Sequence, residues 1–239
     1  MNIAVIFAGG SGQRMNSKSL PKQFLELHGK PIIIYTLEQF QNHLEIDKII
    51  LICIESWIPY CRKLMSYYKI DKLDAIVPGG INGQLSIYQG IKKAYSLYDP
   101  NSVVLVHDGV RPLIDKETIS QAIRSVEKNG SAITIAPVTE TVIEKEKDGK
   151  IKTIINRSLC ELARAPQCFY LKDLYHAHSL AVSQSKTDFI DSASLMAHYG
   201  YKLYTVEGKP ENIKITTPFD FYTFRALLDA RENSQIFGV

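Results

Sequence analysis

Short, continuous apolar runs alternate with amphipathic stretches over the first half of the chain. The runs are IAVIF (3–7), KIILICI (48–54) and SVVLVH (102–107). Because successive side chains of a strand point to opposite faces, a run without polar breaks indicates a strand covered on both faces, as in a parallel sheet. Between the runs, apolar residues recur at helical spacing: Ile33, Leu37, Phe40 and Leu44 behind Pro31, and then Leu85, Tyr88, Ile91 and Tyr95. This order predicts right-handed βαβ units in a three-layer α/β domain with a mostly parallel central sheet.

The middle of the chain changes to a pattern typical of a β-hairpin. Two β-compatible stretches in TVIEKEKDGKIKTII (141–155) are joined by Asp148-Gly149. This pair favours a type I′ turn, in which both central residues need positive φ. The hairpin is dense in Lys and Glu, so it is expected to protrude into water or onto a partner; a plain solvated edge hairpin is an equal alternative.

The C-terminal region carries the arrangement of a helix start, with Thr217 as N-cap, Pro218 at the first helical position and Asp220 three residues after the cap. No internal repeat, low-complexity tract or linker divides the sequence. Residues 1–239 are therefore predicted to form a single domain.

Composition narrows the classes of protein that fit this pattern. The 239 residues are 45% hydrophobic and 22% charged, and 28 basic against 25 acidic residues give a net charge of +3, so no nucleic-acid partner is expected. No apolar run approaches the roughly 18 residues of a membrane span, and the N-terminal sequence lacks the features of a signal peptide. The four scattered cysteines indicate reduced thiols. We expect a cytoplasmic protein with no membrane partner.

A glycine-rich turn follows the first apolar run directly. In Ala8-Gly9-Gly10-Ser11-Gly12, glycines let backbone N–H groups approach phosphate oxygens. A dinucleotide site would have a third glycine where Met15 stands, and the Gly-Lys-Ser/Thr of a Walker A loop is absent. The turn therefore favours a nucleoside triphosphate bound by other means.

Cationic side chains follow this turn closely, namely Arg14, Lys18 and Lys22. Surface lysines and arginines usually contact only solvent, but a position beside a phosphate-binding turn favours a role in binding or catalysis. Cations there neutralise the charge that develops during phosphoryl or nucleotidyl transfer. Arg14 and Lys22 are accordingly candidate catalytic residues.

Asp108 ends the third apolar run, within HDGVRP (107–112). Open α/β sheets bind ligands at the carboxyl ends of their strands, where this carboxylate could hold a metal-bound triphosphate or orient a hydroxyl. The alternative is that it caps the next turn. Asp108 is the candidate metal ligand, and no certain one is assigned. His107 is expected to be structural, while His176 and His178 should point to different faces of a helix and are not interpreted as a metal site.

Motifs along almost the whole chain resemble one enzyme family. In order they are AGGSGQRM, PKQFLELHGKPII, VHDGVRP, APVTET, NR (156–157), APQ (165–167), DSAS (191–194) and EGKPENIKITTP. This succession resembles the cytidylyltransferases that act on polyol phosphates, which comprise the 2-C-methyl-D-erythritol 4-phosphate and ribitol-5-phosphate enzymes. The resemblance implies a Rossmann-like nucleotidyltransferase fold. It also implies transfer of CMP from CTP to a polyol phosphate, with release of pyrophosphate.

The resemblance further implies roles for individual residues. Arg14, Lys22, Lys214 and Arg157 are the expected catalytic residues, of which Arg14 and Lys22 match the family's transition-state-stabilising pair. The expected nucleotide-binding residues are Phe7, Ala8, Gly9, Gly10 and Gly12 for the triphosphate, and Gly80, Ile81, Asn82, Gly83, Gln84, Leu85 and Ser86 for cytosine and ribose. The expected acceptor-binding residues are Asp108, Arg111, Thr141, Arg157, Ile190 and Lys214. The hairpin at 141–155 resembles the arm by which family members dimerise, so we expect a homodimer in which Arg157 acts across the subunit boundary.

The chemistry of this reaction suits a site rich in cations. An acceptor phosphate oxygen is already an anion at neutral pH, so the reaction needs no general base. Its obstacle is repulsion between that anion and the triphosphate. Lysine and arginine side chains, together with Mg²⁺ held mainly by the CTP phosphates, reduce this repulsion and fix an in-line approach.

Some positions depart from the family pattern. Gly83 stands where the second loop usually carries an arginine, Ile190 replaces a threonine, and Ala165 replaces the threonine of a Thr-Pro-Gln sequence. Arg164 and Lys186 are candidates to compensate. These departures leave open an altered acceptor or a weakened catalyst.

Other features favour the ribitol branch: Ala-Gly-Gly in the first loop, Asn156-Arg157, Val110 and a length near 240. The expected product is CDP-ribitol for surface polymers, although another polyol phosphate is almost as well supported. Two alternatives stay open. One is the methylerythritol phosphate enzyme of isoprenoid synthesis, and the other is a nucleotide-binding homologue without turnover.

Overall fold

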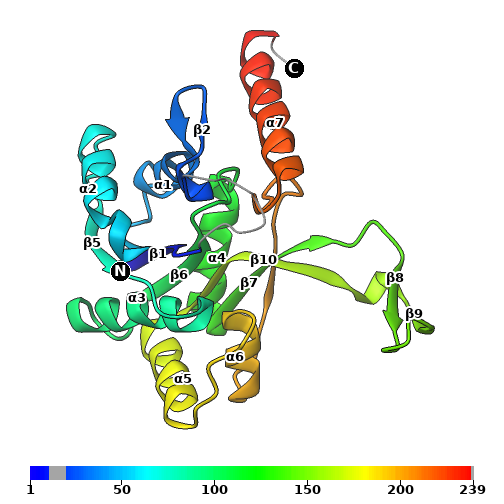
Figure 1. Cartoon of the computed structure of the whole chain (residues 1–239). Coiled ribbons are helices and arrows are strands. Elements are labelled where there is room, and N and C mark those ends of the chain that lie inside the picture. The colour runs from blue at the N-terminus through cyan, green and yellow to red at the C-terminus, as the bar shows by residue number, and fades with distance from the viewer. Residues whose placement is uncertain (11–19, 238–239) are drawn as a thin grey trace.

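A seven-stranded, mostly parallel sheet forms the centre of the protein in a computed structural model, which describes residues 1–10 and 20–237 (Figure 1). Its strands are β1 (Asn2–Ala8), β4 (Lys48–Cys53), β5 (Leu73–Pro78), β6 (Val103–Asp108), β7 (Ser131–Pro137), β10 (Glu161–Tyr170) and β11 (Thr205–Glu207). They lie in the order β11-β7-β10-β6-β1-β4-β5. β10 runs antiparallel to both of its neighbours, and the other pairings are parallel. The predicted α/β class and mostly parallel sheet are confirmed.

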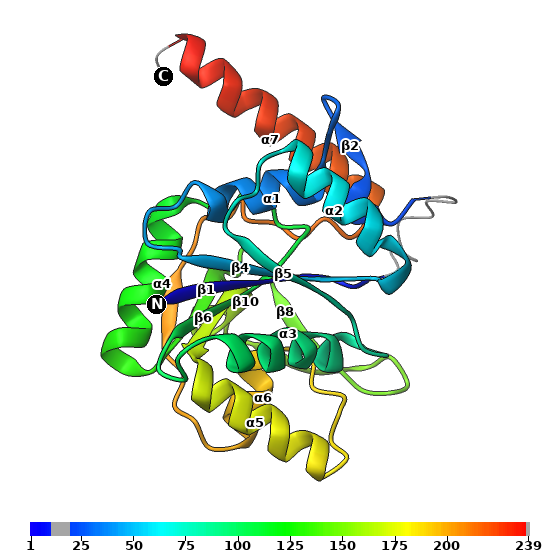
Figure 2. The same ribbon diagram turned by 90° about the vertical axis from the view of Figure 1, so that its left-hand side faces the viewer.

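Helices cover both faces of this sheet, as Figure 2 shows with α1, α2 and α7 on one side and α3, α5 and α6 on the other. The helices are α1 (Ile32–Gln41), α2 (Ile58–Tyr67), α3 (Gly83–Leu97), α4 (Lys116–Asn129), α5 (Leu171–Ser183), α6 (Ser192–His198) and α7 (Pro218–Phe237). Single-turn 3₁₀ helices occupy Lys22–Phe24, Glu55–Trp57 and Arg157–Leu159. The two faces have separate apolar cores, one with α1, α2 and α4 and the other with α3, α5 and α6. The predicted three layers are therefore present.

The predicted strands are confirmed, because the three continuous apolar runs form β1, β4 and β6 at the middle of the sheet. The first predicted helix is shorter than its periodicity suggested. α1 ends at Gln41, and Leu44 lies beyond it with 98% of its surface exposed. Pro31 serves as the N-cap of α1 instead of its first helical residue. One apolar residue in register with a helical pattern does not extend a helix when no core lies beneath it.

The predicted hairpin is confirmed as β8 (Val142–Lys145) and β9 (Ile151–Ile155), which project from the body of the protein (Figure 1). The predicted type I′ turn is wrong. Of the two central residues only Gly149 has positive φ, at 93°. The N–H of Gly149 donates to the carbonyl of Glu146 and the N–H of Glu146 to that of Lys150, which makes a longer turn with a left-handed glycine. We call residues 139–162 the arm.

A crossover segment, residues 208–217, runs from the edge strand β11 across the carboxyl ends of the strands to α7. Backbone hydrogen bonds hold it at both ends, from the N–H of Gly208 to Ile135 and from that of Ile215 to Val110. The predicted start of α7 is confirmed, since Thr217 and Asp220 exchange side-chain to backbone hydrogen bonds in both directions.

Two further features bear on the sequence predictions. All four cysteines have free thiols. Within residues 1–10 and 20–237, no helix combines the length and hydrophobicity that crossing a bilayer requires.

A second, small sheet lies ahead of α1. It is a pair of two-residue strands, β2 (Glu26–Leu27) and β3 (Lys30–Pro31).

Candidate active site

The carboxyl ends of β1 and β6 meet at a cavity of about 280 Å³. The register of the sheet pairs Phe7 with Asp108, so the glycine-rich turn after β1 begins beside the predicted acidic residue. The cavity is lined by Phe7, Gly83, Gln84, Ile87, Val106, His107, Asp108, Arg111, Ala163, Arg164, Ala165, Gln167, His178, Phe189, Ile190, Asp191, Ser192 and Lys214. This volume lies just below the ~300–1,000 Å³ range of small-molecule sites.

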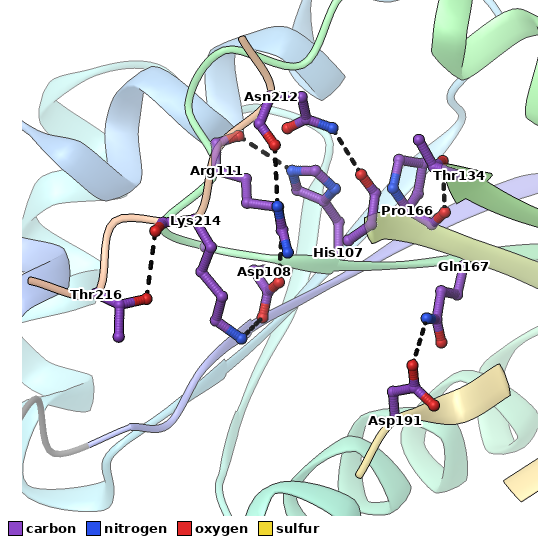
Figure 3. Close-up of polar contacts among 12 residues, drawn as sticks. His107, Asp108, Arg111, Thr134, Pro166, Gln167, Asp191, Asn212, Lys214 and Thr216 are labelled. Carbon is purple, nitrogen blue, oxygen red and sulfur yellow. Dashed lines mark hydrogen bonds and ion pairs between the residues drawn. The ribbon is translucent and has the colours of Figure 1, made fainter. Parts of the chain in front are cut away.

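Asp108, Arg111 and Lys214 form an ion cluster, drawn in Figure 3, and all three line this cavity. The Nε of Arg111 lies 2.8 Å from Oδ2 of Asp108, and the Nζ of Lys214 lies 2.6 Å from Oδ1. Burial alone would raise the pKa of Asp108, but the charges and hydrogen bonds of Lys214 and Arg111 hold the pKa of this carboxyl well below its usual range. Asp108 therefore stays ionised and keeps two cations in place at neutral pH.

The carboxylate does not cap the following turn, which was the alternative for Asp108. The turn is closed by its backbone carbonyl, which accepts from the N–H of Arg111. His107 has the structural role predicted for it, because its Nε2 lies 3.1 Å from the carbonyl oxygen of Arg111. Burial lowers the pKa of His107 to about 4, so the ring is neutral. A neutral Nε2–H donates in that contact.

The crossover segment is held against the cavity by cationic side chains that donate to its carbonyl groups. Arg111 Nη1 donates to Asn212 at 2.9 Å, Arg164 Nη1 to Pro210 at 2.7 Å, and Lys22 Nζ to Ile215 at 3.1 Å. These contacts place Lys214, which belongs to the same segment, opposite Asp108. Three cations, Lys22, Arg111 and Arg164, thus bind the backbone of the segment that carries the fourth, Lys214; of the four, Lys22 is not among the cavity-lining residues in the described part of the chain.

The second predicted loop packs against the first through Ser86. Its Oγ accepts from the N–H of Gly80 at 2.9 Å and donates to the carbonyl of Asn82 at 2.7 Å. A Cβ atom placed on Gly9 would lie 3.5 Å from the same Oγ, so the two loops are in contact. A Cβ on Gly80 would approach Leu85 to 2.8 Å, which requires glycine there.

Side chains at the start of α3 bind a neighbouring loop. Asn82 caps α3 by accepting from the N–H of Leu85, and its Nδ2 donates to the carbonyl of Thr187. Gln84 donates to the carbonyl of Lys186 and accepts from the N–H of Phe189. These hydrogen bonds hold the segment that brings Ile190 to the cavity.

The structure brings together many of the residues predicted for the site. Phe7, Gly83, Gln84, Asp108, Arg111, Ile190 and Lys214 line the cavity, with Ile190 92% exposed. Ala8, Gly9 and Gly10 follow β1 at its edge, with Gly80, Ile81, Asn82, Leu85 and Ser86 in the adjoining loop and first turn of α3. Gly12 and Arg14 lie outside the described residues.

Thr141 and Arg157 are not among the described residues that line the cavity. Both are exposed and belong to the arm, where Arg157 Nη1 donates to the carbonyl of Thr139 at 2.7 Å. Their predicted roles stay predictions.

Sequence reasoning assigned no role in the site to several lining residues. Gln167 donates to Asp191 at 2.9 Å, and Asp191 also accepts from the N–H of Ser194 to cap α6. The sequence DSAS carried this cap signal. His178 follows the buried positions of α5 (Leu171, Leu174, Ala177 and Ala181), so its spacing indicated burial. The prediction that the two histidines point to different faces is confirmed, with His178 facing inward and His176 exposed.

The described residues offer no ready metal site. No group of three or more His, Cys, Asp and Glu side chains among them is placed to hold a metal ion. Asp108 has the oxygen ligands that Mg²⁺ prefers, but each of its oxygens lies against a cation.

The ion cluster predicts a pH-dependent contribution to folding stability. The pKa of Asp108 is lower in the folded protein, so its stabilisation is complete above the unfolded value of about 4 and is lost as pH falls through the folded value. We expect Asp108→Asn to lower the free energy of unfolding by about 3–5 kcal/mol near neutral pH. Denaturant titrations of both proteins should show this difference shrinking below about pH 4. The exposed Asp188→Asn is the control, and a difference that persists unchanged at low pH would contradict the assignment.

Comparisons with known proteins match this chain over nearly its whole length. The family model for IspD, 2-C-methyl-D-erythritol 4-phosphate cytidylyltransferase, matches residues 2–230. A ribitol-5-phosphate cytidylyltransferase of Vibrio parahaemolyticus is 50% identical over 238 residues, with all of both chains covered. A 2-C-methyl-D-erythritol 4-phosphate cytidylyltransferase of Clostridium botulinum is 36% identical over 95% of this chain and 97% of its own. The crystal structure of 4-diphosphocytidyl-2C-methyl-D-erythritol synthase from Anaerococcus prevotii superposes with a TM-score of 0.82 at 29% identity, covering 95% of this chain and 96% of that one.

Proposed function

Because this chain belongs to the 2-C-methyl-D-erythritol 4-phosphate cytidylyltransferase family, we propose that it transfers CMP from CTP to D-ribitol 5-phosphate, giving CDP-ribitol and pyrophosphate. The observation that carries the proposal is the set of Arg111, Arg164 and Lys214 lining the cavity where β1 and β6 end, with Lys22 bonded to the same crossover segment at Ile215. A reaction between a phosphate anion and a triphosphate is limited by charge repulsion, which such cations reduce.

The steps follow from the chemistry of the two substrates. An oxygen of the acceptor phosphate attacks the α-phosphorus of CTP and forms a new P–O bond. The bond between that phosphorus and the bridging α–β oxygen breaks, and pyrophosphate leaves with the electron pair. Lys214 and Arg111, fixed by Asp108, hold the acceptor phosphate. Lys22 stabilises charge at the reacting phosphate. The attacking oxygen is already ionised, so no proton has to be removed.

Mg²⁺ enters this proposal as part of the substrate. Since both Asp108 oxygens are in ion pairs, the CTP phosphates supply most of its ligands. Magnesium–CTP is therefore the nucleotide that the enzyme uses. The charge that the metal carries adds to that of the lysines and arginines.

The choice of acceptor rests on relatives. The Vibrio parahaemolyticus protein, 50% identical with both chains fully covered, is a ribitol-5-phosphate cytidylyltransferase. The methylerythritol phosphate relative of Clostridium botulinum is 36% identical. This difference favours ribitol 5-phosphate, and CDP-ribitol would supply a surface polymer from the cytoplasm, where CTP is made.

Pyrophosphate release tests the proposal directly. CTP and Mg²⁺ are supplied with ribitol 5-phosphate, methylerythritol 4-phosphate, other pentitol phosphates or glycerol 3-phosphate. We expect kcat/KM for ribitol 5-phosphate to exceed the others by about 100-fold, which is about 2.7 kcal/mol of discrimination. A preference for methylerythritol 4-phosphate would instead identify the enzyme as a methylerythritol phosphate cytidylyltransferase. Absence of turnover with retained CTP binding would identify a nucleotide-binding homologue without activity.

We also propose that two copies associate through the arm. Its apolar side chains are unusually exposed: Ile143 (48%), Ile151 (59%), Ile154 (66%), Leu159 (83%) and Leu162 (48%). Such a cluster of exposed apolar groups on a projecting hairpin favours a protein partner. A second copy that receives the arm would bring Thr141 and Arg157 to its own cavity.

A charge in this apolar cluster tests the dimer. We expect Ile154→Asp to convert a dimer to a monomer, because a carboxylate cannot be buried there without a partner. Light scattering coupled to size exclusion measures the mass. Leu44→Asp, a change at an exposed leucine outside the arm, is the matched control and should leave the dimer intact. A fully active monomeric wild-type protein would refute the proposal.

A further inference from the structure

His178 is a buried polar side chain in the cavity that the proposed reaction has not used. It lies on α5 with 1% of its surface exposed and lines the cavity. Its ring stacks on Tyr88 with centroids 5.3 Å apart and 9° between the planes. Neither Nδ1 nor Nε2 has a hydrogen-bond partner among the described residues. Leaving a buried polar group unpaired costs about 1–3 kcal/mol, so such a group calls for an explanation.

Among the other buried polar side chains of the cavity, His107 keeps Nδ1 without a partner in the part of the chain that the structure describes but uses Nε2 on the carbonyl of Arg111, and the two buried amides are paired at both ends. Gln84 uses both ends of its amide on the backbone of Lys186 and Phe189. Gln167 likewise donates to Asp191 and accepts from the N–H of Ala193. These amides hold loops in place, whereas the His178 ring keeps its hydrogen-bonding capacity for something that enters the cavity.

The cavity differs in character between its two regions. Asp108, Arg111, Arg164 and Lys214 supply charge where β6 ends, beside the crossover segment. Phe7, Ile87, Val106 and Phe189 supply apolar walls on the face that α3 and α5 cover, where His178 lies. A ligand that fills both regions has an anionic group at one end and a neutral, hydrogen-bonding group at the other.

The state of the imidazole defines what it can recognise. Burial lowers the pKa of His178 to about 4, so the ring is neutral near pH 7. A neutral imidazole presents one donor and one acceptor nitrogen. A hydroxyl group both donates and accepts, and it brings no charge into an apolar region.

We propose that His178 binds a hydroxyl group of the acceptor's carbon chain while the acceptor phosphate lies among Arg111, Arg164 and Lys214. His178 is then a specificity-determining residue that selects a polyol phosphate long enough to reach it. This inference rests on the proposed function, since it places the acceptor in this cavity. It goes beyond that function by naming His178 as the residue that makes binding depend on the length of the acceptor's carbon chain.

Substitution of His178 separates this role from a structural one. We expect His178→Phe to raise KM for ribitol 5-phosphate about tenfold or more, the value of one hydrogen bond of about 1.5 kcal/mol. KM for CTP should change less than twofold. The preference for ribitol 5-phosphate over glycerol 3-phosphate, which lacks the distal hydroxyls, should fall by the same factor. His178→Gln, which keeps a donor and an acceptor, should restore part of the preference.

His176→Phe is the matched control, because this histidine lies on the same helix with its side chain exposed. It should leave both KM values and the preference unchanged. If His178→Phe does not fold, imidazole nitrogen NMR of the wild-type protein tests the same contact. Ribitol 5-phosphate should shift the His178 resonances, and glycerol 3-phosphate should not.

The outcomes distinguish this inference from the function on which it rests. An unchanged acceptor preference in His178→Phe, with active wild-type enzyme, would overturn the role of His178 alone. A rise in KM for CTP instead would also overturn it, because the ring would then contact the nucleotide. A wild-type protein without cytidylyltransferase activity toward any acceptor would overturn both.

Discussion

We expect replacement of Lys22 by alanine to lower kcat by about two to three orders of magnitude, the range for loss of one preorganised charge-stabilising donor. The Lys22 side chain is 9% exposed, and its Nζ donates to the carbonyl of Ile215, next to Lys214. A cation held in this way needs no reorganisation when charge develops on the reacting phosphate. Pyrophosphate release at saturating CTP and acceptor measures the effect.

Two further variants show whether the charge or the fold is responsible. Lys22→Arg keeps a positive charge and should retain more activity than the alanine variant. Lys30→Ala removes a lysine that pairs with Glu38 on the outside of α1, and it should leave kcat nearly unchanged. An unaltered rate in well-folded Lys22→Ala would remove this lysine from the mechanism.

Replacing Lys214 by alanine is expected to lower kcat/KM for the acceptor by about 100-fold to 1,000-fold. The change removes one of the two cations that Asp108 fixes and leaves its Oδ1 without the contact at 2.6 Å. The effect should concentrate on the acceptor, because Lys214 lines the cavity assigned to it. Initial rates with each substrate varied in turn separate the two KM values.

Lys209→Ala is the matched control for this variant. Lys209 belongs to the same crossover segment with an exposed side chain, while its backbone carbonyl faces Arg164. Removal of its side chain should leave catalysis intact. If Lys214→Ala raised only KM for CTP, the cavity would be assigned to the wrong substrate.

The sequence was sufficient to predict the elements that local pattern determines. The continuous apolar runs became β1, β4 and β6 because each is buried on both faces at the centre of the sheet. The predicted end of the first helix and the predicted turn type of the hairpin were wrong, because both depend on tertiary packing. Leu44 continued a helical spacing but has no core to cover, and Asp148 satisfied a turn preference that the observed turn does not use.

The site could be predicted only in part, for a related reason. The glycine-rich turn and Asp108 were found because each directly follows a recognisable strand. Lys214 was assigned from a resemblance, since no local signal joins it to a carboxylate 106 residues away. His178 was correctly expected to differ from His176 in the face it presents, but the cavity beside it depends on how α3 and α5 pack.

The crossover segment has a consequence for the order in which the enzyme becomes functional. The carbonyl of its Ile215 accepts a hydrogen bond from Lys22, which lies 193 positions earlier in the sequence. The segment also supplies Lys214, which follows the last strand of the sheet. Such distant contacts form late, because the intervening chain must first be brought together. A ribosome-bound chain that ends at Glu207 contains every strand of the sheet but not Lys214. If Lys214 has its proposed role, cytidylyl transfer begins only when synthesis is nearly complete, and a chain that ends before this lysine lacks part of the site.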